Sequence, residues 1–205
     1  MTNNKTKKLV GIAILASLAW IISMLSFPIL PGTPFLKVDF SDLAVLFGMY
    51  VFGPGAGIAI AFIRSLLSYA STGGEMGFPI GDTAAFIATL SFTLPLYYLL
   101  IKRGTSHRNK LLSVGIASVS LTIVMSLVNW LFIAPAYMAV MGFSVGPMVT
   151  YIIYALLPFN MIKGVLVGTV FYIAFVKIRP MLDRTKNKGR QKKKTNLALN
   201  KSVDN

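Results

Sequence analysis

The chain has no cysteine, one histidine and six acidic residues among its 205 residues. Without cysteine there is no disulfide, no haem attached through cysteine and no thiolate metal site. The one histidine, His107, stands in a basic stretch, and no pair of His or Glu residues has the spacing of metal ligands. A serine–histidine hydrolase acting inside a membrane would need its histidine at membrane depth, so that class is excluded as well.

The sequence also lacks the dipeptide Gly-Lys. A Walker A loop ends in this dipeptide and holds the phosphates of ATP, so the chain has no ATP site of its own. We therefore expect binding or transport rather than an enzyme, and no cofactor. No nucleic-acid partner is expected either, because the formal net charge of +14 follows from basic segments that flank apolar ones.

Charge is scarce, and long apolar runs are abundant. Only 13% of the residues are charged and 55% are hydrophobic, whereas a soluble domain carries about 25% charged residues. Crossing about 30 Å of hydrocarbon takes about 20 helical residues. Four stretches of about this length or longer carry no charge: Leu9–Phe27, Thr83–Ile101, Leu111–Ala134 and Met148–Val176. The last of them is interrupted only by Lys163. The composition predicts an all-α polytopic membrane protein.

A further uncharged stretch, Leu43–Ile63, contains a turn signal in its middle. The motif is "FGPGAG", in which Pro54 lacks a backbone donor and its flanking glycines are poor helix formers. We predict a tight turn between two short helices, the second running from about Gly55 to Ala70 and containing Arg64.

The basic residues indicate the orientation, since Lys and Arg in short loops mark the cytoplasmic side. They cluster at residues 5–8, at residues 102–110 and in the tail from residue 177. Six transmembrane helices with both termini cytoplasmic place 17 of the 20 basic residues inside; the exceptions are Lys37, Arg64 and Lys163. We expect a six-helix domain over residues 1–180. Residues 181–205 should form a basic, disordered cytoplasmic tail near anionic lipid.

In this topology the remaining polar residues gather in the outer half of the bundle. They are Asp39, Asp42, Arg64, Glu75, Asp82, Asn129, Asn160 and Lys163. Polar groups are costly in hydrocarbon and normally face a bundle interior or a cavity. The pattern predicts a pocket open to the outside.

The stretch "LLPFNMIKG" places Asn160 and Lys163 three residues apart, so the two share one helix face. Pro158 should bend this helix and free a carbonyl near them. One interpretation is a ligand-binding face. The other is structural: Lys163 would pair with Asp39 or Asp42, and Asn160 would tie helices together.

Other polar and aromatic positions have different expected roles. For Arg64 we favour an ion pair with a carboxylate, whereas Asn129, in "VNWLFIAPAY", fits a binding role and a structural role equally well. Trp130, Phe132 and Tyr137 are typical of the aromatic belt at a membrane interface.

Four motifs in order, "FLKVDFSDLAVLFG", "IRSLL", "NWLFIAPAY" and "PFNMIKG", resemble the riboflavin-specific substrate-binding subunit (S component) of energy-coupling factor (ECF) transporters. The resemblance covers about residues 5–178. It implies a bacterial cell-membrane protein that binds riboflavin from outside with high affinity, as transported substrate. It also implies a transmembrane coupling subunit and two cytoplasmic ATPases as partners, with which the subunit reorients to deliver the vitamin inward.

The resemblance also assigns residues. It implies that the polar edge of the isoalloxazine ring is bound by Asn129, Asn160 and Lys163. A carboxamide offers both a donor and an acceptor, and an ammonium donates, so these groups complement an edge that alternates carbonyls with an imide N–H. For the ribityl hydroxyls it implies Asp39 with its neighbours Val38, Phe40 and Ser41. For docking to the coupling subunit it implies the small residues of the first helix, Ala13, Ala16 and Ser17.

Three alternatives remain open. The chain could be an S component for another vitamin, which the colour of the purified protein would decide. It could be a self-sufficient secondary transporter, whose uptake would persist without ATPase partners. It could also be a scaffold without a ligand, which no vitamin would stabilise.

Overall fold

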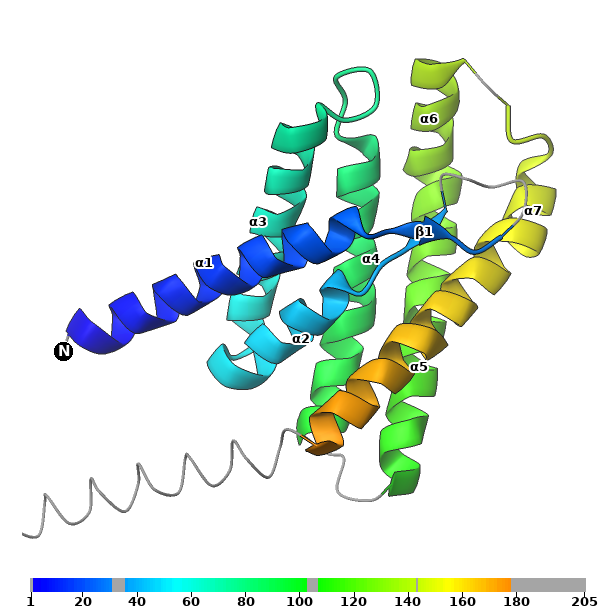
Figure 1. The fold of residues 1–205 in the computed structure, drawn as a ribbon. Coiled ribbons are helices and arrows are strands. Elements are labelled where there is room, and N and C mark those ends of the chain that lie inside the picture. Colours follow the sequence, from blue (N-terminus) through cyan, green and yellow to red (C-terminus); the bar gives the residue numbers. More distant parts are fainter. Residues whose placement is uncertain (1, 31–35, 103–106, 143, 178–205) are drawn as a thin grey trace, which may run out of the picture. The chain divides into compact units, whose positions relative to one another are not determined.

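The computed structural model describes residues 2–30, 36–102, 107–142 and 144–177 (Figure 1). The chain divides into two compact units, residues 1–169 and 170–205. Of the second unit only residues 170–177 are described, and they are helical. The predicted domain boundary at residue 180 and the basic tail, residues 181–205, lie outside the described residues.

The described chain is mainly helical. Its helices are α1 (Thr2–Met24), α2 (Ser41–Phe52), α3 (Pro54–Thr72), α4 (Ile80–Leu96), α5 (His107–Val128), α6 (Ala134–Met141) and α7 (Met148–Tyr151). Three π-helical segments extend them: η1 (Tyr97–Lys102), η2 (Asn129–Ile133) and η3 (Ile152–Leu156). The helix that begins with α7 and η3 continues to residue 177. The strands β1 (Phe27–Pro28) and β2 (Lys37–Val38) pair antiparallel, with Phe27 opposite Val38. The predicted all-α class is confirmed.

Four helical stretches are long and apolar enough to cross a membrane: Lys5–Met24, Ile80–Leu100, Arg108–Met141 and Met148–Lys177. The apolar helix α2 is shorter, with 12 residues. Large apolar side chains on α1 and α5 stay uncovered, such as Ile14 (62% exposed) and Ile123 (55% exposed). A surface of this kind suits contact with lipid, which has no polar group to offer.

The predicted turn at Pro54 is confirmed. Helix α2 ends at Phe52, Gly53 takes a positive φ of 93°, and Pro54 is the first residue of α3. Proline suits this position because its fixed φ is helical and its missing N–H would have had no partner there. The two helices then pack closely, since a Cβ at Gly57 would lie 2.1 Å from Cγ of Met49.

Proline also accompanies the π-helical segments. The N–H of Leu157, just before Pro158, donates to the carbonyl of Ile152, five residues back. Likewise the N–H of Ala134, just before Pro135, donates to the carbonyl of Asn129. Since proline cannot donate to the carbonyl four residues back, a π-turn lets the helix continue with a shifted hydrogen-bond register. Such turns change which residues share a face, and two of them border the polar positions discussed below.

Small residues let helices approach closely at two places in the first unit. Along one side, Ala16 and Ala19 of α1 are fully buried with Val45 of α2 and Ile60 of α3, and Figure 1 shows these three helices together. Elsewhere, a Cβ at Gly164 would lie 2.5 Å from Oγ of Ser118 on α5. The last helix therefore packs against α5 almost backbone to backbone, which holds the polar residues around Gly164 close to that helix.

Candidate ligand-binding site

A cavity of about 560 Å³ lies within the first unit, lined by β2, α3, α4, the continuous helix α5–η2–α6 and the last helix. Its volume falls in the range of about 300–1,000 Å³ that is usual for small-molecule sites. Helix α4 lines it with Ala84, Ala85 and Ala88, whose small side chains leave room. Tyr151 and Phe159 contribute aromatic surface. These side chains make part of the wall apolar, and amide, hydroxyl and charged side chains make the rest of it polar.

Two asparagines line the cavity from different helices, and they are oriented alike. Asn129 is 4% exposed and Asn160 is 2% exposed. Nδ2 of Asn129 donates to the carbonyl of Met125 at 2.9 Å, and Nδ2 of Asn160 donates to the carbonyl of Leu156 at 3.0 Å. Among the described residues, nothing donates to either Oδ1. Each amide is thus held by its own helix and keeps an acceptor and one N–H for another molecule.

Lys163 lines the same cavity one turn beyond Asn160 and is 9% exposed. Within the described part of the chain its ammonium has no hydrogen bond and no ion pair. Asp39, also in the lining, accepts a hydrogen bond of 2.7 Å from the N–H of Ser41. Burial raises the pKa of the Asp39 carboxyl, but the charges of Lys163 and Arg64 and the hydrogen bonds from Ser41 outweigh it, so the pKa lies below its ordinary value.

The carboxylate of Asp42 has other partners. Its Oδ1 lies 3.6 Å from Nη1 of Arg64 and accepts a hydrogen bond of 2.6 Å from Oγ1 of Thr89. Arg64 also donates to Oγ of Ser41. The ion pair expected for Arg64 is confirmed, and Lys163 does not pair with Asp42 in the described structure. Asn160 bonds to its own helix rather than tying two helices together.

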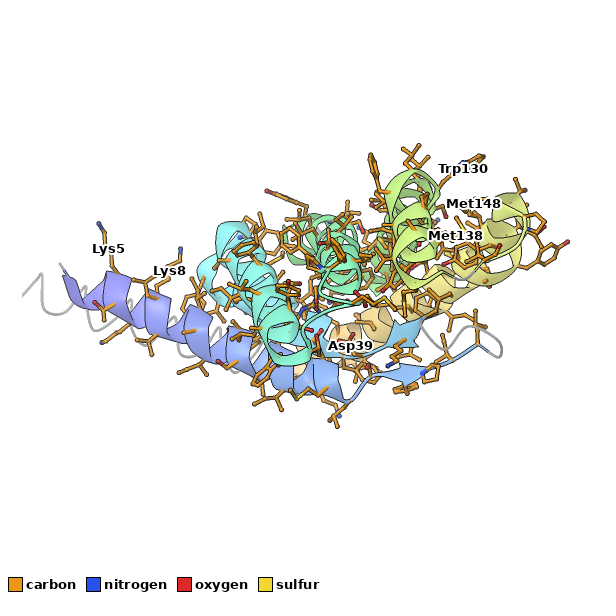
Figure 2. The ribbon with its side chains drawn as sticks, turned by 90° about the horizontal axis from the view of Figure 1, so that it is seen from above. Lys5, Lys8, Asp39, Trp130, Met138 and Met148 are labelled. Atoms are coloured by element: carbon orange, nitrogen blue, oxygen red, sulfur yellow. The ribbon has the colours of Figure 1, made fainter. Side chains whose placement is uncertain are left out.

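The α3–α4 loop adds a polar group that the motifs did not indicate. Glu75 lines the cavity, and its Oε1 accepts a hydrogen bond of 2.9 Å from the hydroxyl of Tyr137. Its Oε2 accepts another, also 2.9 Å long, from the N–H of Gly81. Tyr137 lines the cavity too, whereas Trp130 and Phe132 of the same helix are 53% and 67% exposed. Figure 2 shows Trp130 on the outside of its helix. Of the three predicted belt residues, Tyr137 faces inward instead.

The remaining predicted site residues take different places. Of the segment Val38–Ser41, only Asp39 lines the cavity. Val38 is fully buried, and Ser41 accepts a hydrogen bond from Arg64 and donates one to Asp39, so these neighbours hold Asp39 in place. Figure 2 shows Asp39 far from Lys5 and Lys8, which mark the first turns of α1.

The small residues of α1 face two ways. Ala13 and Ser17, four residues apart, are exposed on one side of the helix. Ala16 is fully buried against α2 and α3. A partner helix approaching α1 in this structure would therefore meet Ala13 and Ser17, and it would not meet Ala16.

The cavity combines two buried amides, the Lys163 ammonium and three carboxylates with small and aromatic side chains. Such an arrangement can bind a flat, mostly apolar molecule that has a polar edge. In the described chain no group of three or more His, Asp or Glu side chains lies close enough to hold a metal ion. The chemistry that this lining offers is recognition by hydrogen bonds and charge.

The chain is similar to known proteins over most of its length. Residues 7–175 match the family model of the ECF transporter substrate-specific component. The riboflavin transporter FmnP of Bacillus subtilis is 36% identical over 187 residues, covering 89% of this chain and 97% of its own. The riboflavin transporter RibU of Staphylococcus aureus is 32% identical over 182 residues, covering 88% and 94%. A solved structure, described as the S component of a bacterial ECF transporter, superposes with a TM-score of 0.72 at 33% identity, covering 87% of this chain and 98% of that one.

Proposed function

We propose that this chain, which belongs to the family of substrate-specific components of ECF transporters, binds riboflavin and presents it for import. The family and the long apolar helices make it a multi-pass protein of the bacterial cell membrane, and its relatives are transporters, not enzymes. The resemblance seen in the four sequence motifs is confirmed at the level of the family. The identity of the vitamin, the residues that bind it and the partners are the substance of the proposal.

The observation that carries the proposal is the pair of buried asparagines whose Oδ1 atoms accept no hydrogen bond from the described chain. The polar edge of the isoalloxazine ring carries an imide N–H between two carbonyls. An Oδ1 of Asn129 or Asn160 accepts from the imide, and the remaining amide N–H donates to a neighbouring carbonyl. Lys163 donates to a further carbonyl or ring nitrogen. These are the donors and acceptors that this edge requires.

The rest of the cavity suits the rest of the vitamin. Apolar ring surface fits against Ala84, Ala85 and Ala88 of α4, and Phe159 offers an aromatic face for stacking. The ribityl chain carries hydroxyls, which both donate and accept. Asp39 accepts from such hydroxyls, and its neighbours Val38, Phe40 and Ser41 contribute by fixing its position and through their backbone.

For transport, the proposal includes six membrane spans with both termini in the cytoplasm and the cavity opening outward. Helices α2 and α3 then form two short spans joined at Gly53, with the buried Arg64–Asp42 pair between them. A transmembrane coupling subunit docks on the exposed small residues Ala13 and Ser17 of α1, and two ATPases supply energy. The argument for this face is that Ala13 and Ser17 are small and exposed one turn apart, between larger exposed side chains such as Ile14 and Leu18.

The test is the absorption spectrum of the protein, purified in detergent from cells that are supplied with riboflavin. We expect a bound flavin at about one per chain. A second preparation, with Asn129→Ala and Asn160→Ala combined, should lose most of it. Wild-type protein that is folded by its melting curve but free of flavin, and that another vitamin stabilises, would mean that the pocket serves a different substrate.

A further inference from the structure

Two carboxylates line the cavity at the end where the α3–α4 loop meets α6. Glu75 lies in that loop and Asp82 in the first turn of α4. Figure 1 shows the loop at the same end of the helices as the end of α6, and the Glu75–Tyr137 hydrogen bond joins them. Along α5–η2–α6, Tyr137 follows Asn129 by eight residues, which corresponds to about 12 Å of helix. The carboxylates therefore stand well apart from the buried amides.

Glu75 is oriented by hydrogen bonds at the wall of the cavity. Both of its oxygens accept hydrogen bonds, one from Tyr137 and one from the N–H of Gly81. Gly81 also makes room for this contact, because a Cβ there would lie 2.5 Å from Oε1 of Glu75 and 2.8 Å from the Tyr137 hydroxyl. The negative charge is thus fixed at the wall of the cavity, with lone pairs left to accept from a ligand.

The charges of the cavity are unevenly compensated. The charges of Lys163 and Arg64 act on Asp39, and Arg64 is also paired with Asp42. Glu75 and Asp82 have no cation in an ion pair with them among the described residues. The lining contains two lysines and three acids, and the second lysine, Lys37, is exposed in β2. The loop end of the cavity is therefore net negative.

An independent observation marks this cavity as a ligand site. The ammonium of Lys163 is nine-tenths buried, lines the cavity and has no hydrogen bond or ion pair with the described chain. A buried ammonium without such partners is costly unless a ligand supplies them.

We propose that Glu75 and Asp82 select the uncharged vitamin against its phosphate ester. This inference rests on the proposed function, because it takes the ring edge of riboflavin to lie at the amides. The hydroxyl end of the ribityl chain then lies toward the two carboxylates. Carboxylates accept hydrogen bonds from hydroxyls, but they repel a phosphate, which carries a charge of about −1.5 to −2 at neutral pH. At this place in the cavity the free vitamin gains a hydrogen bond, whereas a flavin phosphate is repelled.

The experiment compares riboflavin with riboflavin 5′-phosphate on purified protein, by the quenching of flavin fluorescence. Two charges about 10 Å apart in a protein change an affinity by about tenfold. Wild-type protein should therefore bind the phosphate about 100-fold more weakly than the vitamin, since two carboxylates act. Glu75→Gln and Asp82→Asn should each reduce this ratio about tenfold. Asp82→Asn leaves the Glu75–Tyr137 hydrogen bond intact, so it covers the case in which Glu75→Gln disturbs the loop.

Two controls accompany these variants. Lys37→Gln removes a positive charge from the lining and should increase the ratio. Arg108→Gln removes a charge at the opposite end of the α5–η2–α6 helix and should leave the ratio unchanged.

The outcomes separate this inference from the proposed function. Wild-type protein that binds neither flavin overturns both. Wild-type protein that binds riboflavin tightly, but binds the phosphate equally well, overturns the inference alone. So does a ratio that stays the same in both acidic-site variants while the two affinities fall together, since that is the effect of a purely structural role.

Discussion

Asn160→Ala removes one of the two buried amides that line the cavity. In the structure Nδ2 is fixed on the carbonyl of Leu156 at 3.0 Å, and the side chain is 2% exposed, so the amide is held before any ligand arrives. An acceptor that is desolvated and already oriented loses little entropy on binding. Deleting it leaves the imide N–H of the ring buried without a partner, which costs about 1–3 kcal/mol. At 1.4 kcal/mol per tenfold, riboflavin should bind about 5- to 150-fold more weakly.

The assay is a titration of detergent-purified protein with riboflavin, followed by flavin fluorescence. Thr122→Ala is a matched control. Thr122 is buried on α5, and its Oγ1 donates to the carbonyl of Ser118 at 2.8 Å, four residues back, as the Asn160 amide does. It does not line the cavity, so its loss should leave the riboflavin affinity within about twofold of wild type. If Asn160→Ala keeps the wild-type affinity, or if both variants weaken binding alike, Asn160 does not contact the ring and the reasoning from the cavity is refuted.

The other predictions concern charge, docking and topology. Lys163→Met keeps the length of the side chain but removes its charge, so riboflavin should bind at least about tenfold more weakly. The melting temperature without ligand should stay at the wild-type value. A lower melting temperature with unchanged affinity would indicate that Lys163 serves only to neutralise Asp39. Ser17→Trp should leave riboflavin binding intact and abolish uptake in cells, whereas loss of both would place this face of α1 in the core. Because the native chain has no cysteine, Met76→Cys should react from outside intact cells with a membrane-impermeant maleimide and Arg108→Cys should not; the reverse pattern would invert the topology.

The helical class and the break at Pro54 could be predicted from the sequence because their causes are local. Apolar length decides whether a helix crosses a membrane, and proline after glycine decides where one ends. The ion pair of Arg64 was expected for a similar reason, since a cation at membrane depth requires a counter-charge. The sequence does not indicate which acid supplies this counter-charge. Asp39 and Asp42 are three residues apart, and only the tertiary structure assigns Asp42 to Arg64 and turns Asp39 toward the cavity.

Tyr137 shows a second limit. An aromatic side chain near the end of a membrane helix is typical of the interface, and Trp130 and Phe132 have that exposure. The π-turn at Asn129–Ile133 shifts the helix register between these residues and Tyr137, which helps to turn Tyr137 inward toward Glu75. A residue count with the ordinary helical period does not include such a shift. Residue spacing also could not decide whether Ala16 belongs to the core or to a docking face, because small residues suit both.

The central claim is that this cavity binds riboflavin through its two buried amides. The most direct measurement is a riboflavin titration of purified wild-type protein beside the double variant Asn129→Ala with Asn160→Ala, with folding checked by melting curves. The account predicts saturable quenching at about one flavin per chain for wild type, and a loss of affinity of more than about 100-fold for a double variant that remains folded. A double variant that binds riboflavin as tightly as wild type, or a folded wild-type protein without saturable quenching, would contradict it.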